Sequence, residues 1–300
     1  MRLGYPCINR SIGCTANSTF RLASYSKQNL LAKVENNLNC LMKILEYNVK
    51  NGLFFFRISS DLVPFASHPI CKVDWSKHFE KKFKAIGSFI MKNRIRISMH
   101  PDQFVLINSP RRIIVQRSIK ELEYHCKVLD AMELDSTAKV QIHIGGVYND
   151  KEKAIDRFIT EYESLPTSIK KRLVIENDHI SYGLKDCLVI HKRIKIPVIF
   201  DTFHHKCLNN GESINAAIKM AKKTWSKKDG ILMIDYSSQK PKAKKGTHAE
   251  HINIKHFKKF IEETKNFDFD LMLEIKDKER SALKAIRVLK EIRKYNRLLF

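Results

Sequence analysis

Eight histidine and carboxylate side chains lie at, or just after, the ends of short apolar runs in the sequence. They are His100, His143, Glu176, Asp201, His204, Asp235, His248 and Glu274. Imidazole and carboxylate ligands together suit zinc, manganese or iron better than calcium, and no thiolate belongs to the set. If these side chains converge, several buried carboxylates would be costly to ionise, and divalent cations would remove that penalty. Eight ligands exceed the needs of one ion, so the set predicts two or three catalytic ions that activate water and clamp a phosphodiester.

Such convergence requires a fold that brings the ends of many strands to one place. Short apolar runs alternate with longer amphipathic ones along the chain, which predicts alternating strands and helices. The predicted strands are Leu3–Ile8, Phe54–Ser59, Arg96–Met99, Val140–Ile144, Arg172–Ile175, Pro197–Phe200, Ile231–Ile234 and Asp270–Ile275. The predicted helices are Gln28–Lys50, one within Trp75–Lys92, Ile113–Met132, Asp150–Leu165, Lys185–Arg193, Ser213–Thr224, Ile254–Lys265 and Glu279–Tyr295.

Eight strand–helix units in 300 residues are typical of a TIM (β/α)8 barrel, in which all strands end at one face and active sites lie there. Several strands are apolar at consecutive positions, as expected for parallel strands covered on both faces. An open doubly wound sheet is the alternative, but no Gly-x-Gly-x-x-Gly follows the first strand. No linker divides the chain, so we expect a single TIM-barrel domain over residues 1–300. The chain contains no run of about 18 apolar residues that would predict a membrane helix.

The balance of charges favours a polyanionic partner. Lys and Arg outnumber Asp and Glu by 55 to 32, a net charge of +23, and nucleic acid is the first candidate. An A/T-rich genome that inflates the lysine content is the alternative explanation. The densest basic run is Lys240-Pro241-Lys242-Ala243-Lys244-Lys245-Gly246, after the seventh strand, and a solvated loop is its alternative interpretation. The candidates for phosphate contacts in this region are Ser237, Ser238, Lys242, Lys244 and Lys245.

The cysteines indicate where in the cell the protein is found, but they do not indicate a catalytic role. Seven cysteines, an odd number without a Cys-x-x-Cys pair, predict reduced thiols in a cytoplasmic protein. The first ten residues lack the apolar region of a signal peptide. Cys7 and Cys207 lie near the predicted site without an evident histidine partner, so we interpret all seven cysteines as structural or incidental.

Segments at the strand ends, taken together, resemble the UV damage endonuclease family, which is related to endonuclease IV. They are Met99-His100-Pro101-Asp102-Gln103-Phe104, Val140-Gln141-Ile142-His143, Ile175-Glu176-Asn177-Asp178, Asp201-Thr202-Phe203-His204-His205, Tyr236-Ser237-Ser238-Gln239, Leu273-Glu274-Ile275-Lys276, and Leu3-Gly4-Tyr5 with Asn9. The resemblance implies a xylose-isomerase-like TIM barrel. It also implies an enzyme that nicks damaged double-stranded DNA immediately 5′ of cyclobutane pyrimidine dimers and 6-4 photoproducts. Manganese is the implied metal, with zinc, magnesium or cobalt as alternatives.

The resemblance assigns roles to most of the eight candidate ligands. The family's metal ligands correspond here to His100, His143, Glu176, Asp201, His204, His248 and Glu274. Among them we assign the catalytic role to Glu176, His143 and His204. Two positions depart from the family: Asp235 stands where a histidine ligand is usual, and Met233 stands where a carboxylated lysine is often found. Asp235 can still bind a hard divalent ion, whereas Met233 cannot be modified in that way.

The resemblance also implies residues that contact the damaged strand. Gln103 and Phe104 correspond to a pair that enters the helix to probe the damage, although the second member is often tyrosine. Wedges of this kind unstack bases, and a photodimer that stacks badly is easier to extrude than a normal base step. The alternative is that Phe104 packs under its own loop. Tyr5 and Asn9 correspond to positions of the first strand that approach the damaged strand.

Three other functions remain open at this level. An apurinic endonuclease of the endonuclease IV type would carry Asp-x-His in the seventh loop, but here Gly246 stands two residues before His248. A xylose-isomerase-like sugar isomerase would share the barrel but would gain nothing from a charge of +23. The third is a DNA-binding protein with a degenerate site. We expect a monomer that acts on DNA and has no contact with a membrane.

Overall fold

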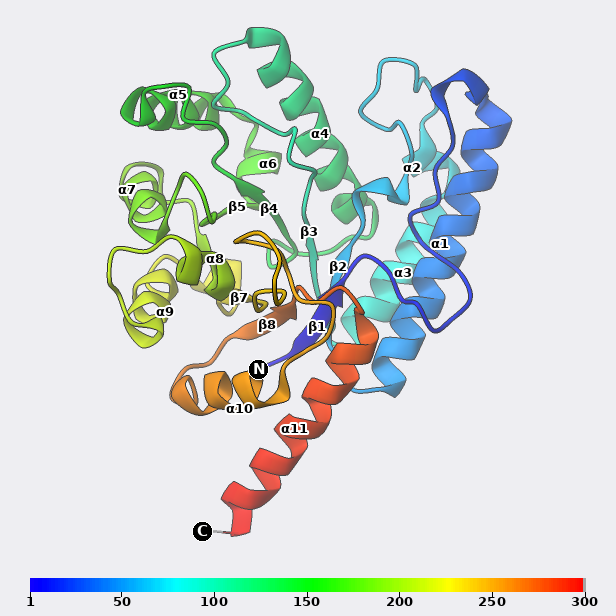
Figure 1. Ribbon diagram of the computed structural model, residues 1–300. Coiled ribbons are helices and arrows are strands. Elements are labelled where there is room, and N and C mark those ends of the chain that lie inside the picture. Colours follow the sequence, from blue (N-terminus) through cyan, green and yellow to red (C-terminus); the bar gives the residue numbers. More distant parts are fainter. Residues whose placement is uncertain (299–300) are drawn as a thin grey trace.

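The computed structural model describes residues 1–298, and within them eight short parallel strands form a closed barrel. Each strand pairs with the next along the chain, and the last pairs with the first. The helices surround the outside of the barrel (Figure 1). The strands are β1 (Leu3–Pro6), β2 (Phe55–Ile58), β3 (Arg96–Met99), β4 (Lys139–His143), β5 (Leu173–Glu176), β6 (Val198–Asp201), β7 (Met233–Tyr236) and β8 (Asp270–Leu273). The predicted TIM barrel is therefore confirmed.

Helices follow every strand, and each long helix that the sequence predicts is present within a few residues. They are α1 (Lys27–Lys50), α2 (Trp75–His78), α3 (Glu80–Lys92), α4 (Arg112–Ala131), α5 (Lys151–Ser164), α6 (Thr167–Lys170), α7 (Leu184–Ile194), α8 (Thr202–Cys207), α9 (Ile214–Lys222), α10 (Ile254–Glu263) and α11 (Glu279–Leu298). Short 3-10 turns are η1 (Leu22–Ser24), η2 (Ser60–Leu62) and η3 (Lys227–Asp229). The segment predicted as one helix within Trp75–Lys92 is two helices that meet at Phe79. The short helices α6 and α8 were not predicted, because four to six residues carry no usable period.

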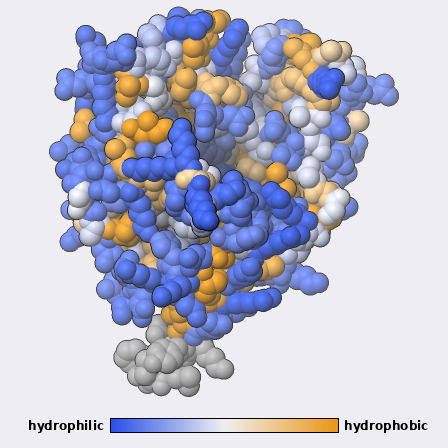
Figure 2. Space-filling view, in the orientation of Figure 1, coloured by the Kyte–Doolittle hydropathy of each residue, from blue (hydrophilic) through white to orange (hydrophobic). Residues whose placement is uncertain are grey.

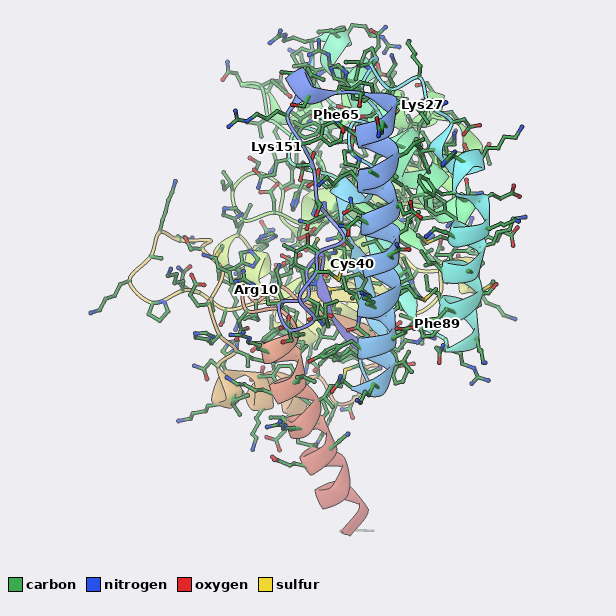
Figure 3. All side chains as sticks on the ribbon, turned by 90° about the vertical axis from the view of Figure 1, so that its right-hand side faces the viewer. Arg10, Lys27, Cys40, Phe65, Phe89 and Lys151 are labelled. Atoms are coloured by element: carbon green, nitrogen blue, oxygen red, sulfur yellow. A yellow bond between two sulfur atoms is a disulfide. The ribbon has the colours of Figure 1, made fainter. Side chains whose placement is uncertain are left out.

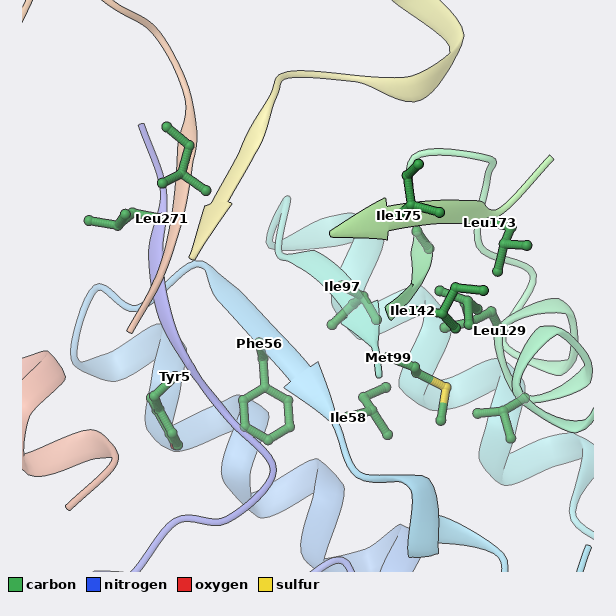
Figure 4. Packing of buried hydrophobic residues seen from close by; sticks show 14 of the residues in the cluster. Tyr5, Phe56, Ile58, Ile97, Met99, Leu129, Ile142, Leu173, Ile175 and Leu271 are labelled. Atoms are coloured by element: carbon green, nitrogen blue, oxygen red, sulfur yellow. The ribbon is translucent and has the colours of Figure 1, made fainter. Parts of the chain in front are cut away.

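The inside of the barrel is filled by an apolar layer below its open end. Phe55, Val174, Ile199, Met233 and Met272 pack there against one another, each from a different strand. Their neighbours along each strand face the surrounding helices, where a second and larger core lies (Figure 4). Because side chains alternate along a strand, the residue two positions after each inward-facing one also faces inward. The apolar layer therefore closes the barrel and places polar residues at the carboxyl ends of the strands.

One disulfide corrects the prediction of seven reduced thiols. Cys14, in the loop after β1, is bonded to Cys40 on α1, and the other five cysteines are free. The same loop is tied to α1 by Asn37, whose side chain bonds both backbone groups of Ser18 at 3.0 Å. Figure 3 shows Cys40 on the side of α1 that this loop crosses. The pairing joins residues 26 positions apart, and nothing in the spacing of the cysteines indicates it.

A buried histidine supports the strand end that carries His100. His125 of α4 is fully buried, with Nδ1 2.8 Å from the carbonyl oxygen of Glu121 and Nε2 3.0 Å from the hydroxyl oxygen of Ser60. The Ser60 hydroxyl in turn donates to the carbonyl oxygen of His100 at 2.9 Å. Burial lowers the pKa of His125 to about 4 from its ordinary 6.5. His125 is therefore neutral in the folded protein at pH values where it is protonated in the unfolded chain.

This shift predicts a loss of stability in weak acid. Between pH 6.5 and about pH 4 the unfolded chain binds a proton at His125 that the folded protein does not, so the stability falls as the pH falls. The contribution is at most about 3 kcal/mol. Urea unfolding at a series of pH values should show a smaller acid loss in His125→Gln than in the wild type. The exposed His78 provides the control, because His78→Gln should keep the wild-type profile. Equal acid losses in His125→Gln and the wild type would contradict the assignment.

Candidate metal centre

The carboxyl ends of the strands surround a cavity of about 850 Å³. Its lining includes His100, His143, His204, His248 and Glu274. A hollow opens near the middle of the molecule in Figure 2, among mainly hydrophilic side chains. The candidate ligands of the sequence thus border one open space at the face where barrel enzymes have their active sites.

Seven of the eight candidate ligands form three overlapping groups of three. In each group the ligand atoms all lie within 4.8 Å of one another. The first trio is His100, His143 and Glu176; the second trio is Glu176, Asp201 and His204; the third trio is Asp201, Asp235 and Glu274. Glu176 is shared by the first two trios and Asp201 by the last two, so the trios form a continuous row. His248 stands beside the row, with Nδ1 3.7 Å from Oε2 of Glu274.

Backbone carbonyl groups orient three of the histidine rings. Nδ1 of His100 is 2.9 Å from the carbonyl oxygen of Pro101, and Nδ1 of His248 is 2.9 Å from that of Glu274. Nδ1 of His204 is 3.0 Å from the carbonyl oxygen of Asn177. Since a carbonyl oxygen only accepts, each of these Nδ1 atoms carries a proton. In His100 the other ring nitrogen, Nε2, then faces Glu176 Oε2 at 3.4 Å, whereas in His204 it is Nδ1 itself that lies 3.2 Å from Glu176 Oε1. Such contacts with carbonyl groups are the usual way in which proteins fix the orientation of metal-binding imidazoles.

The short helix α8 brings Asp201 and His204 into the second trio. Asp201 is the last residue of β6, and its Oδ1 accepts hydrogen bonds from the backbone N–H groups of Phe203 and His204, both at 2.6 Å. This cap starts the helix directly at the strand end and turns His204 back toward the barrel. The other carboxylate oxygen of Asp201, Oδ2, is buried and has no hydrogen-bond partner among the described residues.

The unpartnered atoms and the charges of the row both fit divalent cations. Besides Asp201 Oδ2, the buried atoms Asp235 Oδ1 and His143 Nδ1 lack hydrogen-bond partners in the described part of the chain. Burial raises the pKa of Asp201 well above its ordinary value. Burial acts to lower the pKa of His204, but Asp201 and Glu176 outweigh it and raise that pKa to about 11. The carboxylates of the second trio therefore favour a positive charge beside them, which a divalent cation would supply.

Two residues of the centre were missed from the sequence. The guanidinium of Arg57 on β2 is buried, and its Nη2 donates to Asp235 Oδ2 at 2.7 Å while Nη1 pairs with Glu274. Gln141 on β4 accepts from Arg57 at 2.8 Å, and its amide donates to Glu176 at 2.5 Å and to Asp235 at 2.6 Å. A signal for Arg57 does exist in the sequence, since it is the one charged residue in the apolar run Phe54–Ile58.

Residues predicted to contact DNA from the first strand and the seventh loop are partly buried. Tyr5 has no exposed surface; its hydroxyl donates to Asn48 at 2.7 Å and accepts from Asn9, also buried, at 2.8 Å. The register of β1 turns Tyr5 toward the helices, beside Phe56 (Figure 4). Ser237 is buried too, and its hydroxyl donates to the carbonyl oxygen of Glu274 at 2.9 Å. In this structure the three side chains support the strand ends, and direct contact of any of them with DNA stays a prediction.

The other predicted DNA contacts lie at the surface around the cavity. Gln103 lines the cavity, and the neighbouring Phe104 is 60% exposed. Ser238 is half-buried next to Ser237. The lysine-rich loop between β7 and α10 borders the cavity at Gly246 and extends away from the barrel in Figure 3, in the yellow-orange part of the colour scale. Its exposed lysines, which form no ion pair within the described residues, are Lys242, Lys244 and Lys245.

Comparison of the chain with known proteins identifies the family to which it belongs. The family model described as UV-endonuclease UvdE matches residues 1–299 of the chain. The chain belongs to the UvdE family. A UV DNA damage endonuclease of Clostridium perfringens (strain 13 / Type A) is 44% identical over 98% of this chain and 72% of its own length. That of Bacillus thuringiensis subsp. konkukian (strain 97-27) is 34% identical over 99% of this chain and 97% of its own.

Solved structures that are similar to this chain have the same barrel fold. The structure named SacUVDE is 48% identical to this chain, covers 98% of it and 99% of its own chain, and superimposes with a TM-score of 0.93. Endonuclease IV from Thermus thermophilus is 14% identical, covers 84% of this chain and 93% of its own, and gives a TM-score of 0.58. The latter shares the barrel fold with the UvdE family. None of the described helices is long and apolar enough to cross a membrane.

Proposed function

We propose that this protein is a metal-dependent endonuclease that nicks double-stranded DNA immediately 5′ of UV photolesions. The row of three ligand trios at the mouth of the barrel carries the proposal, together with membership of the UvdE family over residues 1–299. The proposed lesions are cyclobutane pyrimidine dimers and 6-4 photoproducts. A monomer that acts on DNA inside the cell completes the proposal.

The residues present fit two or three divalent ions with mixed nitrogen and oxygen ligands. We propose manganese, with zinc, magnesium or cobalt as alternatives, because the donors are imidazoles and carboxylates without thiolates. When bound, such ions supply an activated water for attack on phosphorus and neutralise charge on the phosphodiester. Glu176 has the central position: its Oε2 is 3.4 Å from His100 and its Oε1 is 3.2 Å from His204. Its two carboxylate oxygens therefore connect the first and second trios.

Recognition of the lesion is assigned to the cavity rim. The exposed ring of Phe104 can stack on a base, and Gln103 beside it can bond to base edges. A distorted photodimer offers less resistance to such insertion than an intact base step, which supplies selectivity without reading the sequence. The basic loop after β7 would hold the phosphates nearby.

A nick-mapping experiment tests the proposal. Duplex DNA that carries one defined photodimer and an end label is incubated with the protein and Mn²⁺, and the product is sized against a sequencing ladder. We expect a single nick directly 5′ of the dimer, none in undamaged duplex and none after addition of EDTA. Cleavage of a duplex with an abasic site, with none at a photodimer, would favour the endonuclease IV type of activity and contradict the proposal. Cleavage that persists in EDTA would contradict the role of metals.

The basic loop gives a prediction about salt. The observed DNA affinity falls with salt concentration because each phosphate contact releases counterions, with a log–log slope of about −0.9 per contact. Replacing Lys242, Lys244 and Lys245 by glutamine should therefore flatten the slope for undamaged duplex by up to about three. Fluorescence anisotropy at a series of KCl concentrations measures the slope.

The control for this prediction changes the same number of charges elsewhere. Lys219, Lys222 and Lys223 are also exposed, at the end of α9, and helices of a barrel run back toward the face opposite the strand ends. Their replacement by glutamine should leave most of the slope unchanged. If both triple variants change the slope equally, the lysines of the loop only add to the overall charge and do not contact phosphate.

A further inference from the structure

The third trio differs from the other two because a cation of the protein already binds it. Two of its three carboxylates, Asp235 and Glu274, are paired with the guanidinium of Arg57, at 2.7 Å for Asp235. The side chain of Arg57 is 3% exposed, so this cation cannot leave the barrel without rearrangement. An arginine is always charged under physiological conditions.

In the first and second trios the groups that approach the carboxylates are imidazoles, and no described guanidinium or ammonium group is paired with Glu176 or Asp201. Glu176 is approached by His100, His143 and His204 and by the amide of Gln141. Asp201 accepts hydrogen bonds from backbone N–H groups through Oδ1, whereas Oδ2 has no hydrogen-bond partner among the described residues and lies 3.7 Å from His204 Nδ1. An imidazole nitrogen can serve as a metal ligand, whereas a guanidinium offers only hydrogen-bond donors. The row therefore has metal-ready ligands at one end and a fixed charge at the other.

The packing below the third trio keeps Arg57 in place. Phe55, two residues before Arg57 on the same strand, packs in the barrel with Met233 and Met272, which precede Asp235 and Glu274 by two residues. This layer is apolar, so it offers no further ligand to an ion at the third trio. Gln141 accepts from the same guanidinium at 2.8 Å and donates to Asp235 at 2.6 Å, which fixes the planar arrangement of the group.

The charges of the centre agree with metal ions at the first and second trios and Arg57 at the third. The four carboxylates Glu176, Asp201, Asp235 and Glu274 carry at most four negative charges. Arg57 and two divalent ions carry five positive charges, which a bound phosphodiester can balance. A third ion would raise the positive charge to seven in a buried site, where unpaired charge is strongly unfavourable.

We propose that Arg57 takes the place of one metal ion at the third trio, so that the centre binds two divalent ions, at the first and second trios. Arg57 thereby acts as a positioning residue for Asp235 and Glu274. The inference deepens the proposed metal-dependent function, but its test counts ions and does not depend on nicking.

The test is the number of Mn²⁺ ions bound per protein, measured by native mass spectrometry and by elemental analysis of the gel-filtered protein. We expect two ions in the wild type and three in Arg57→Met, because the shorter, neutral side chain releases Asp235 and Glu274 for an ion. Arg57→Lys retains a cation and should bind two. Three ions in the wild type, or no gain in Arg57→Met, would overturn the inference.

Two milder variants test the same division if Arg57→Met does not fold. Asp235→Asn removes a ligand of the third trio only, and we expect it to keep two ions. Asp201→Asn removes a ligand of the second trio, and we expect it to lose one. Loss of an ion in Asp235→Asn would place an ion at the third trio and overturn the inference. A wild type with two ions that does not nick photodimer DNA would instead contradict the proposed function and leave the ion count standing.

Discussion

Glu176→Gln is expected to lower the rate of nicking at a photodimer by at least about a thousandfold while most of the lesion binding remains. Glu176 is buried, and its two oxygens face His100 on one side and His204 on the other. Glutamine keeps the size of the side chain but replaces a carboxylate oxygen by an amide, which is a poor metal ligand. Losing charge stabilisation of several kcal/mol in the transition state corresponds to a rate loss of about this size.

Single-turnover nicking and competition binding together check this prediction. The rate is measured with excess protein on a duplex that carries one photodimer, and the lesion preference is measured against undamaged duplex. Glu163→Gln makes the same chemical change at an exposed position of α5 and should leave both quantities unchanged. If Glu176→Gln nicks at a rate near that of the wild type, the two trios that share Glu176 are not the catalytic metal centre.

The barrel and the place of its site could be predicted because both depend on local patterns. Alternating apolar and amphipathic segments define the eight units, and the rule that strands end at one face then brings together side chains as distant as His100 and Glu274. The structure places seven of the eight candidate ligands in one row, and His248 lies beside it. The predicted bounds of the strands and helices are off by a few residues only. For example, β5 and β6 include Glu176 and Asp201, the polar residues directly after the predicted apolar runs.

The features that could not be predicted from the sequence depend on which way a side chain points and on partners that are distant along the chain. Tyr5 was assigned to the DNA face, but strand side chains alternate, and a shift of one residue sends a side chain to the other face. Arg57 finds its partners 178 and 217 residues further along the chain, and no local pattern shows that it pairs with carboxylates. The bond between Cys14 and Cys40 also depends on a loop that folds back on α1. Each of these features follows only when the three-dimensional contacts are known.

If the cavity rim recognises the lesion and the metal centre cleaves the DNA, a change at the rim should alter the preference for the lesion. Phe104→Ala is expected to reduce the preference for photodimer duplex over undamaged duplex by roughly 5- to 150-fold. Stacking of a base on an aromatic side chain is worth about 1–3 kcal/mol, and 1.4 kcal/mol corresponds to tenfold. With 60% of its surface exposed, Phe104 has few contacts within the protein to lose, so the variant should fold normally.

Competition binding and Mn²⁺ content, measured on the same preparations, separate this role from a structural one. Phe104→Tyr keeps the ring and should be close to neutral, whereas the metal content should be unchanged in both variants because Phe104 offers no ligand atom. Met91, an exposed apolar residue at the end of α3 and thus toward the opposite face of the barrel, provides the control, and Met91→Ala should keep the full preference. If Phe104→Ala also keeps it, the ring does not enter the DNA, and selectivity must come from the cavity that Gln103 lines. Phe104 belongs to none of the three ligand trios. Loss of preference with unchanged metal content would therefore show that Phe104 selects the lesion and that the metal centre cleaves the DNA.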